Sequence, residues 1–204
     1  MVKVGLTVRE VVRGLLKGSA FAAVLALATV SPDAVRSQEF DAGWQAYQAG
    51  DYATAIDIWQ PLAEAGDPRA QYNLGSLYYD GRGVPQDRDL AIKWWGEAAG
   101  QGVIEAQHNL GLVFLSGDGA PKALEKARFW LQQAADAGLG RSQYTLGKMY
   151  LHADELEDEG EPDPAKAFEW ILKAGQSGDH RAQYNLGKMY RDGLGAEMDI
   201  KKAV

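Results

Sequence analysis

Cysteine is absent from the 204 residues of this chain, and only three residues are histidine. The lack of cysteine excludes disulfides, thiolate nucleophiles, cysteine metal sites and a lipid-attachment cysteine within this sequence. The histidines, His108, His152 and His180, show neither the His-Glu-x-x-His spacing nor any other metal-ligand spacing. Serine-hydrolase elbows, phosphate-binding P-loops and dinucleotide fingerprints are missing too. We therefore predict no catalytic residues, no metal site and no cofactor.

An excess of positive charge is also missing. The formal net charge is −7, so nothing in the overall charge draws the chain to nucleic acid or to an anionic membrane. Hydrophobic residues make up 46% of the chain and charged residues 24%. This balance predicts a folded domain with a substantial core and not a disordered acidic chain.

The uncharged apolar run at residues 18–30 is well short of the ~20 residues that a membrane span needs. Bases precede it in segment 1–17, and Ser31, Pro32 and a polar stretch follow. A basic segment, a short apolar run and small residues after it are typical of a secretory signal peptide. We expect residues 1–37 to be this signal, with cleavage near Ser37 or, alternatively, after Ala28.

Such cleavage predicts a periplasmic or secreted protein with no stable membrane span. Removal of residues 1–37 takes away five bases and two acids, which leaves 16 bases, 26 acids and a net charge of −10. Without cysteine, the exported chain would depend on packing alone for its stability. An uncleaved anchor, or a cytosolic adaptor with a start further downstream, remains the alternative.

One six-residue pattern occurs four times, as AQYNLG, AQHNLG, SQYTLG and AQYNLG. Its closing glycines are Gly75, Gly111, Gly147 and Gly187, so the period is 36, 36 and then 40 residues. Self-similarity at a period of this length predicts a solenoid, whose units bury their apolar faces by stacking on one another.

Each repeat predicts two helices. In the first complete repeat, Ala70, Leu74 and Leu77 share one face of a helix, and the glycine- and proline-containing segment 81–85 ends that helix. Asp87 is the predicted N-cap of the second helix. We expect helix pairs at 40–66, 67–102, 103–138 and 139–178, and an incomplete pair at 179–204 that stops at the beginning of its last helix.

These residues resemble the Sel-1-like repeat family, a branch of the tetratricopeptide superfamily. Residues 70–102 carry the resemblance, with the pattern A-x-Y-N-L-G-x-x-Y-x-x-G-x-G-V-P-x-D followed by A-x-x-W-x-x-x-A-A-x-x-G. The resemblance covers about residues 40–204 and implies an all-α, right-handed superhelical solenoid of helix-turn-helix repeats. Family members resemble adaptor proteins, many of them exported by bacteria. A cysteine-rich branch is associated with β-lactam binding or hydrolysis, and this chain lacks the cysteines of that branch.

In such solenoids the first helix of each pair lines the groove that holds a ligand. Residues of these helices outside the packing stripe are therefore the candidate partner-binding residues. They are Arg69, Tyr72, Tyr79, His108, Leu112, Arg141, Tyr144, Lys148, Arg181, Tyr184, Lys188 and Arg191. Five bases in the last two repeats favour an acidic or carboxylate-bearing segment of a protein partner. An ordinary solvated helix face is the alternative.

Two further features have structural explanations. Five of the six tryptophans recur at helical spacing on second helices, so most of them are predicted to pack in the core. Trp44 and one of Trp94 and Trp95 are expected to be exposed. The acidic loop at 154–163 lacks the spacing of a calcium loop and is predicted to be a solvated charge run.

Taken together, the sequence predicts a non-enzymatic protein-interaction scaffold or adaptor of the bacterial periplasm or envelope. An envelope enzyme or glycan-binding module acting on peptidoglycan or β-lactams is the alternative.

Overall fold

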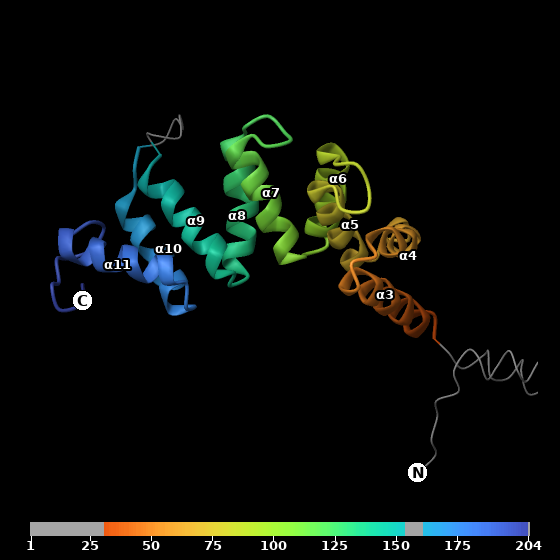
Figure 1. Ribbon diagram of the computed structural model, residues 1–204. Helices are drawn as coiled ribbons and strands as arrows, with labels where there is room; N and C mark the ends of the chain where they lie inside the picture. Colours follow the sequence, from red (N-terminus) through yellow and green to blue (C-terminus); the bar gives the residue numbers. More distant parts are fainter. Residues whose placement is uncertain (1–30, 154–160, 204) are drawn as a thin grey trace, which may run out of the picture. The chain divides into compact units, whose positions relative to one another are not determined.

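A computed structural model describes residues 31–153 and 161–203, which form helices and turns without a β-strand (Figure 1). The chain divides into two compact units, residues 1–58 and residues 59–204. The helices are α3 (Pro32–Gln48), α4 (Tyr52–Glu64), α5 (Pro68–Asp80), α6 (Arg88–Gly100), α7 (Ile104–Ser116), α8 (Leu124–Asp136), α9 (Gly140–Leu151), α10 (Pro164–Gln176) and α11 (His180–Asp192). The prediction of an all-α helical-repeat fold is confirmed.

The first unit contains α3 and the beginning of α4. Helix α3 begins at Pro32, eight residues before the predicted start at Phe40, because the Ser31 hydroxyl accepts a hydrogen bond from the Ala34 amide and caps the helix. The Trp44 ring stacks on Tyr47 with centroids 5.2 Å apart and remains 40% exposed, as the sequence predicted for Trp44. The predicted signal segment lies mostly in residues 1–30, outside the described residues.

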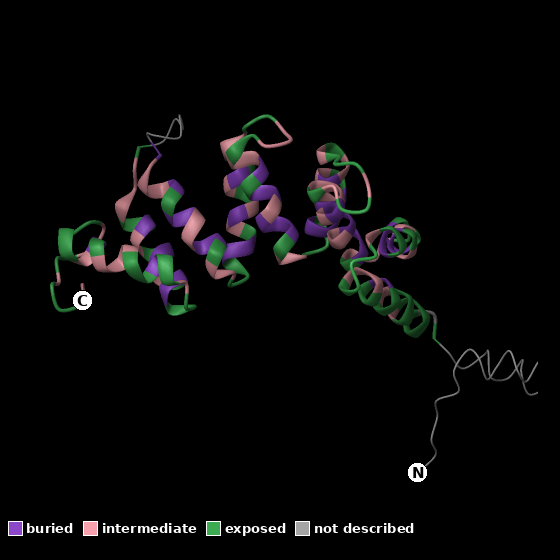
Figure 2. Ribbon diagram, viewed as in Figure 1, coloured by how far each residue is buried: buried purple, intermediate pink, exposed green. Residues whose placement is uncertain are grey.

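In the second unit, successive helices pack against one another in chain order from α5 to α11 (Figure 1). The predicted stripes form its core. Ala70, Leu74 and Leu77 on α5 are each at most 1% exposed, and every helix from α5 to α11 contributes buried residues (Figure 2). The hydrophobic spacing in the sequence therefore identifies the packed faces.

The repeated glycines let the two helices of a pair approach closely. A Cβ atom at Gly111 would lie 2.5 Å from the Leu131 Cγ atom, and one at Gly147 would lie 2.6 Å from the Ile171 Cγ1 atom. Both distances are too short for a real contact. Glycine is needed at these positions for its lack of a side chain and not for its backbone freedom.

The repeated glutamine joins each helix pair to the pair before it. The Nε2 atoms of Gln71, Gln107, Gln143 and Gln183 donate to the carbonyl oxygens of Ala63, Ala99, Ala135 and Gly175, over 3.1, 3.2, 3.0 and 3.1 Å. Each acceptor is the penultimate residue of the preceding helix. Each carbonyl also accepts from a backbone amide of the turn that follows, that of Gly66, Gly102, Gly138 or Gly178. The glutamine therefore adds a second hydrogen bond to an acceptor that is already paired, and a carbonyl oxygen has two lone pairs for this.

Turn residues set the helix ends as the sequence predicted. Gly81, Gly117 and Gly193 end α5, α7 and α11 in the left-handed conformation, with φ of 68°, 78° and 67°. The third repeat has no such glycine, and His152 ends α9 at a φ of −122°. The Asp87 carboxylate accepts a hydrogen bond from the Leu90 amide, as expected of an N-cap. Most of the predicted acidic loop, residues 154–160, lies outside the described residues.

The prediction that one of Trp94 and Trp95 is exposed is wrong. Their exposed fractions are 4% and 3%. Helix α6 packs against both α5 and α7, so more than one of its faces is buried. The exposed aromatic ring on a second helix is instead Phe129 of α8, which is 54% exposed.

Candidate functional site

The candidate residues divide into three groups by burial. The exposed ones are Arg69, Leu112, Arg141, Lys148, Arg181, Tyr184, Lys188 and Arg191. Tyr72, Tyr79 and Tyr144 are half-buried, and His108 is buried. All of them lie on α5, α7, α9 or α11, the first helices of the four repeats.

The expectation that His108 faces an open groove is wrong. His108 is 6% exposed, and its Nδ1 atom lies 2.8 Å from the Oγ atom of Ser142 on α9. Ser142 stands where the other repeats have Ala70, Ala106 and Ala182, so it supplies a hydroxyl inside the packed face. Burial, together with the nearby Arg141 and Arg181 cations, lowers the pKa of His108 to about 4. At neutral pH His108 is a neutral structural residue.

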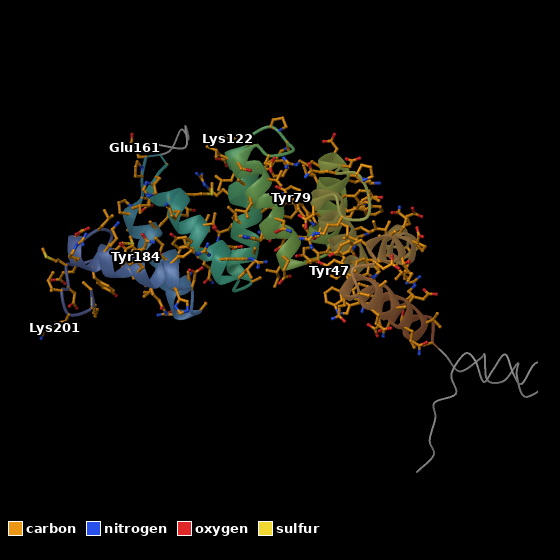
Figure 3. The ribbon with its side chains drawn as sticks, viewed as in Figure 1. Tyr47, Tyr79, Lys122, Glu161, Tyr184 and Lys201 are labelled. Atoms are coloured by element: carbon orange, nitrogen blue, oxygen red, sulfur yellow. The ribbon has the colours of Figure 1, made fainter. Side chains whose placement is uncertain are left out.

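Tyr79 links two repeats. Its hydroxyl donates to a carboxylate oxygen of Asp118 over 2.7 Å, and its ring centroid lies 4.9 Å from that of Trp95 (Figure 3). Asp118 also forms an ion pair with Arg88. The phenol group is therefore engaged within the fold, and only part of the ring is left to contact a partner.

Three of the predicted arginines are neutralised by neighbouring aspartates. Arg69 pairs with Asp67 at 2.8 Å, and Arg181 pairs with Asp179 at 2.7 Å. In both cases the aspartate also caps the helix on which the arginine lies, through its backbone amides. The hydrogen bond from Arg181 lowers the pKa of Asp179 and keeps it charged.

Arg191 likewise pairs with Asp192 at 2.7 Å. In contrast, no carboxylate of the described residues lies within ion-pair distance of Arg141, Lys148 or Lys188. The Lys188 ammonium lies 5.8 Å from the centre of the Tyr184 ring, which is 70% exposed (Figure 3). We call Arg141, Lys148 and Lys188 the basic face. Its cations are exposed and available for an anionic group from outside the chain.

A cavity of about 310 Å³ lies among α5, α6 and α7. Its lining residues are Ser76, Tyr79, Asp80, Trp95, Asn109, Leu112, Val113 and Ser116. The Ser76 and Ser116 hydroxyls donate to the Tyr72 and Leu112 carbonyls over 3.0 and 2.9 Å. These two hydroxyl protons are therefore already used within the helices. We call this the α5–α7 cavity.

The Asn109 carboxamide in this cavity differs from its repeat equivalents. Asn73 and Asn185 each donate to a carbonyl of their own helix over 2.8 Å, and Asn185 also donates to the Tyr144 hydroxyl over 3.0 Å. Asn109 has no hydrogen-bond partner among the described residues. Sequence analysis missed Asn109 because two of its repeat equivalents, Asn73 and Asn185, are also asparagine, and only the structure separates the three.

A second cavity, of about 340 Å³, lies beside α11. It is lined by Gln183, Tyr184, Gly187, Lys188, Arg191, Lys202 and Ala203. It places further cations next to Lys188, although Lys202 is paired with Asp199 at 3.5 Å.

Within the part of the chain that the structure describes, no group of His, Cys, Asp and Glu side chains is placed to hold a metal ion. None of the described helices combines the length and apolar character required to cross a membrane. The groups that converge here are exposed cations, a carboxamide and apolar side chains. Such groups bind another molecule through charge, hydrogen bonds and burial of apolar surface.

Comparison with known proteins finds one family model four times in succession along the chain. The Sel1 repeat family model matches residues 68–103, 104–139, 140–179 and 180–204. Among curated proteins, the mouse DAP3-binding cell death enhancer 1 is 40% identical over 50 residues. That match covers 24% of this chain and 10% of the mouse protein, so the likeness is confined to a small part of the relative.

Solved structures extend the likeness to nearly the whole chain. A protective antigen of uropathogenic Escherichia coli with an SLR fold is 27% identical, with a TM-score of 0.77 over 98% of this chain and 47% of the antigen. A Sel1 repeat protein of Oxalobacter formigenes is 26% identical, with a TM-score of 0.74 over 95% of this chain and 77% of that protein. This chain therefore spans about half the length of the first of these structures.

Sel1 repeat proteins are in general protein-interaction scaffolds, and their repeats imply protein partners. The four matched repeats, the glutamine and glycine contacts that recur in each of them and the likeness to solved Sel1 structures agree with one another. The chain belongs to the Sel1 repeat family.

Proposed function

We propose that this protein is a non-enzymatic scaffold that binds an acidic, carboxylate-bearing segment of a protein partner along α9 and α11. One observation carries the proposal. Arg141, Lys148 and Lys188 are exposed on the first helices of consecutive repeats, and no carboxylate of the described residues lies within ion-pair distance of them. In a chain of net charge −7, three such cations on one face favour an anionic ligand.

The arginines that sequence analysis grouped with these residues contribute less. Arg181 and Arg191 already hold Asp179 and Asp192, and an incoming carboxylate would have to compete with them. A single exposed ion pair contributes about 0–1 kcal/mol, so several unpaired cations must act together. Their main effects are on the rate of encounter and on the orientation of the partner.

We further propose that the protein acts in the bacterial periplasm or envelope. The basic segment and short apolar run within residues 1–30 support export, and both structural relatives described above are bacterial proteins. The N-terminal mass of the protein isolated from its native cells tests this point. A mature chain that begins near residue 29 or 38 supports export, and an intact Met1 opposes it.

A capture experiment tests the binding face. The wild-type chain and the triple variant Arg141→Glu, Lys148→Glu, Lys188→Glu are immobilised and exposed to envelope extract. The matched control is Lys93→Glu, Lys126→Glu, Lys173→Glu, which makes the same change in charge at exposed positions on second helices. A partner held by wild type and control and lost by the triple variant supports the proposal. A partner held equally by all three opposes it.

A further inference from the structure

We propose that the α5–α7 cavity holds an aliphatic side chain of an extended partner segment, and that this segment carries a carboxylate about three residues away, bound by Arg141 and Lys148. The inference deepens the proposed function and rests on it. It defines a binding register, in which the partner's apolar side chain contacts one repeat and its acidic group contacts the next.

The cavity has the surface that an aliphatic anchor needs. Leu112 and Val113 line it together with parts of the Tyr79 and Trp95 rings, and Leu112 is 40% exposed. The positions equivalent to Leu112 in the other repeats are Ser76, Lys148 and Lys188. Leu112 is thus the only apolar residue at this position of the repeat, and it lies at the cavity. Covering it with an aliphatic group removes apolar surface from water on both molecules.

The Asn109 carboxamide suits the main chain of such a segment. An extended chain leaves backbone N–H and C=O groups unpaired, and a carboxamide donates to one and accepts from the other. Asn73 and Asn185 hold their own helix carbonyls instead. Asn109 is therefore available for a ligand at the place where Leu112 offers an apolar contact.

The spacing between the two subsites follows from the contact between α7 and α9. His108 precedes Asn109 and contacts Ser142, and Ser142 follows Arg141. Lys148 is the repeat equivalent of Leu112, one helix pair further along. The contact between the His108 and Ser142 side chains brings α7 and α9 to on the order of 10 Å of each other, and an extended chain advances about 3.3 Å per residue. A segment anchored at Leu112 therefore reaches the basic face within about three residues.

Charge fixes the direction of the segment. Asp80 lines the α5–α7 cavity, and Asp118 accepts a hydrogen bond from the hydroxyl of Tyr79, another lining residue. No basic residue lines this cavity, and Arg82 and Arg88 already pair with the two acids, so a partner carboxylate placed here would find no available cation. Arg141 and Lys148 offer the opposite charge. The acidic residue of the partner therefore points toward α9 and its apolar anchor toward α5.

A random 12-residue peptide library displayed on phage and selected on the full chain tests the register. We expect enriched peptides that carry Leu, Ile, Val or Met with Asp or Glu two to four positions away. For one such peptide, made synthetically, we expect Leu112→Ser and Asn109→Ala to weaken binding by about tenfold and about threefold. The control Phe129→Ser removes an apolar group outside the cavity that is more exposed than Leu112, and it should leave affinity unchanged. Circular dichroism of each variant confirms that it is folded.

The outcomes separate this inference from the proposed function. Acidic peptides with no fixed apolar position, together with unchanged affinity in Leu112→Ser, would overturn the register and leave binding at the basic face intact. If no acidic peptides are enriched, or if Arg141→Glu has no effect on the selected ones, both proposals fail. A double-mutant cycle tests the contact itself. The aliphatic residue of the peptide is replaced by serine, alone and together with Leu112→Ser. If the two changes together weaken binding no more than either does alone, the two side chains are in contact, as proposed.

Discussion

The imidazole of His108 on α7 and the hydroxyl of Ser142 on α9 form a hydrogen-bonding contact of 2.8 Å inside the protein. It joins two consecutive repeats at a position where the other first helices carry Tyr72, Tyr144 and Tyr184. The pair is specific to this junction. It makes the stability of the second unit depend on the protonation of a single buried side chain.

This contact predicts an acid-sensitive fold. The pKa of His108 is about 4 in the folded chain, against an ordinary value of 6.5, because of burial and the nearby cations Arg141 and Arg181. Between these values the unfolded chain binds one more proton than the folded chain. The free energy of unfolding therefore falls as pH decreases through this window, by about 1–3 kcal/mol in total from His108.

Urea unfolding at pH 7.0, 5.5 and 4.5 measures this loss, with His108→Gln as the comparison. The variant should lose less stability than wild type over the same range. The aspartates whose pKa values are lowered, including Asp67 and Asp179, stabilise the fold above their ordinary pKa of 3.8 and lose that effect at lower pH. Most of the stability change between pH 6.5 and pH 4 is therefore expected to come from His108. Equal losses in wild type and variant would show that His108 is not responsible.

The glutamine contact between helix pairs predicts a graded effect. Gln107→Met removes the side-chain donor to the Ala99 carbonyl, a buried hydrogen bond of 3.2 Å, and should cost about 0.5–1.5 kcal/mol, because the carbonyl keeps only its bond from the Gly102 amide. Gln183→Met removes the equivalent donor to Gly175 at an exposed glutamine, where water can replace it, and should cost less. Chemical denaturation of the two variants checks the order. A larger effect at Gln183 would contradict it.

One substitution should act in opposite directions at two glycines. Gly147→Ala puts a methyl group against the Ile171 side chain and 3.1 Å from the Ala167 carbonyl oxygen, and should destabilise the protein by about 1–3 kcal/mol. Gly96→Ala on α6 meets no atom within 4 Å and should stabilise it by up to about 1 kcal/mol. Melting temperatures of the two variants measure the signs. Similar shifts in both would mean that helix propensity, and not close packing, explains the repeated glycine.

Much of the fold could be predicted because the repeat shows the same physical requirement several times. Apolar residues at helical spacing, glycines with positive φ at helix ends and Asp87 as an N-cap all act within a few residues of their own position. The start of α3 at Pro32 was missed because the repeat pattern begins only at Phe40. The Ser31 cap that sets this start lies before the pattern.

The candidate site was less predictable, because its properties arise between repeats. The burial of His108 depends on Ser142, 34 residues away, and the burial of both Trp94 and Trp95 depends on the two neighbours of α6. The neutralised arginines did have a sequence signal. Asp67 precedes Arg69 by two residues, and Asp179 precedes Arg181 by the same spacing. Whether a basic side chain is free to bind a partner can therefore be judged from the sequence only by checking for an acidic residue within a few positions of it.

The most direct test of the central claim is the salt dependence of binding between the chain and the partner segment captured from envelope extract. Affinities for wild type and for Arg141→Glu, Lys148→Glu, Lys188→Glu are measured from about 50 to 500 mM salt, a range over which the Debye length shrinks from about 14 to 4 Å. We predict that wild-type affinity falls steadily with salt and that the triple variant binds at least about tenfold more weakly at the lowest salt. An affinity that ignores salt and survives the three charge reversals would contradict the account.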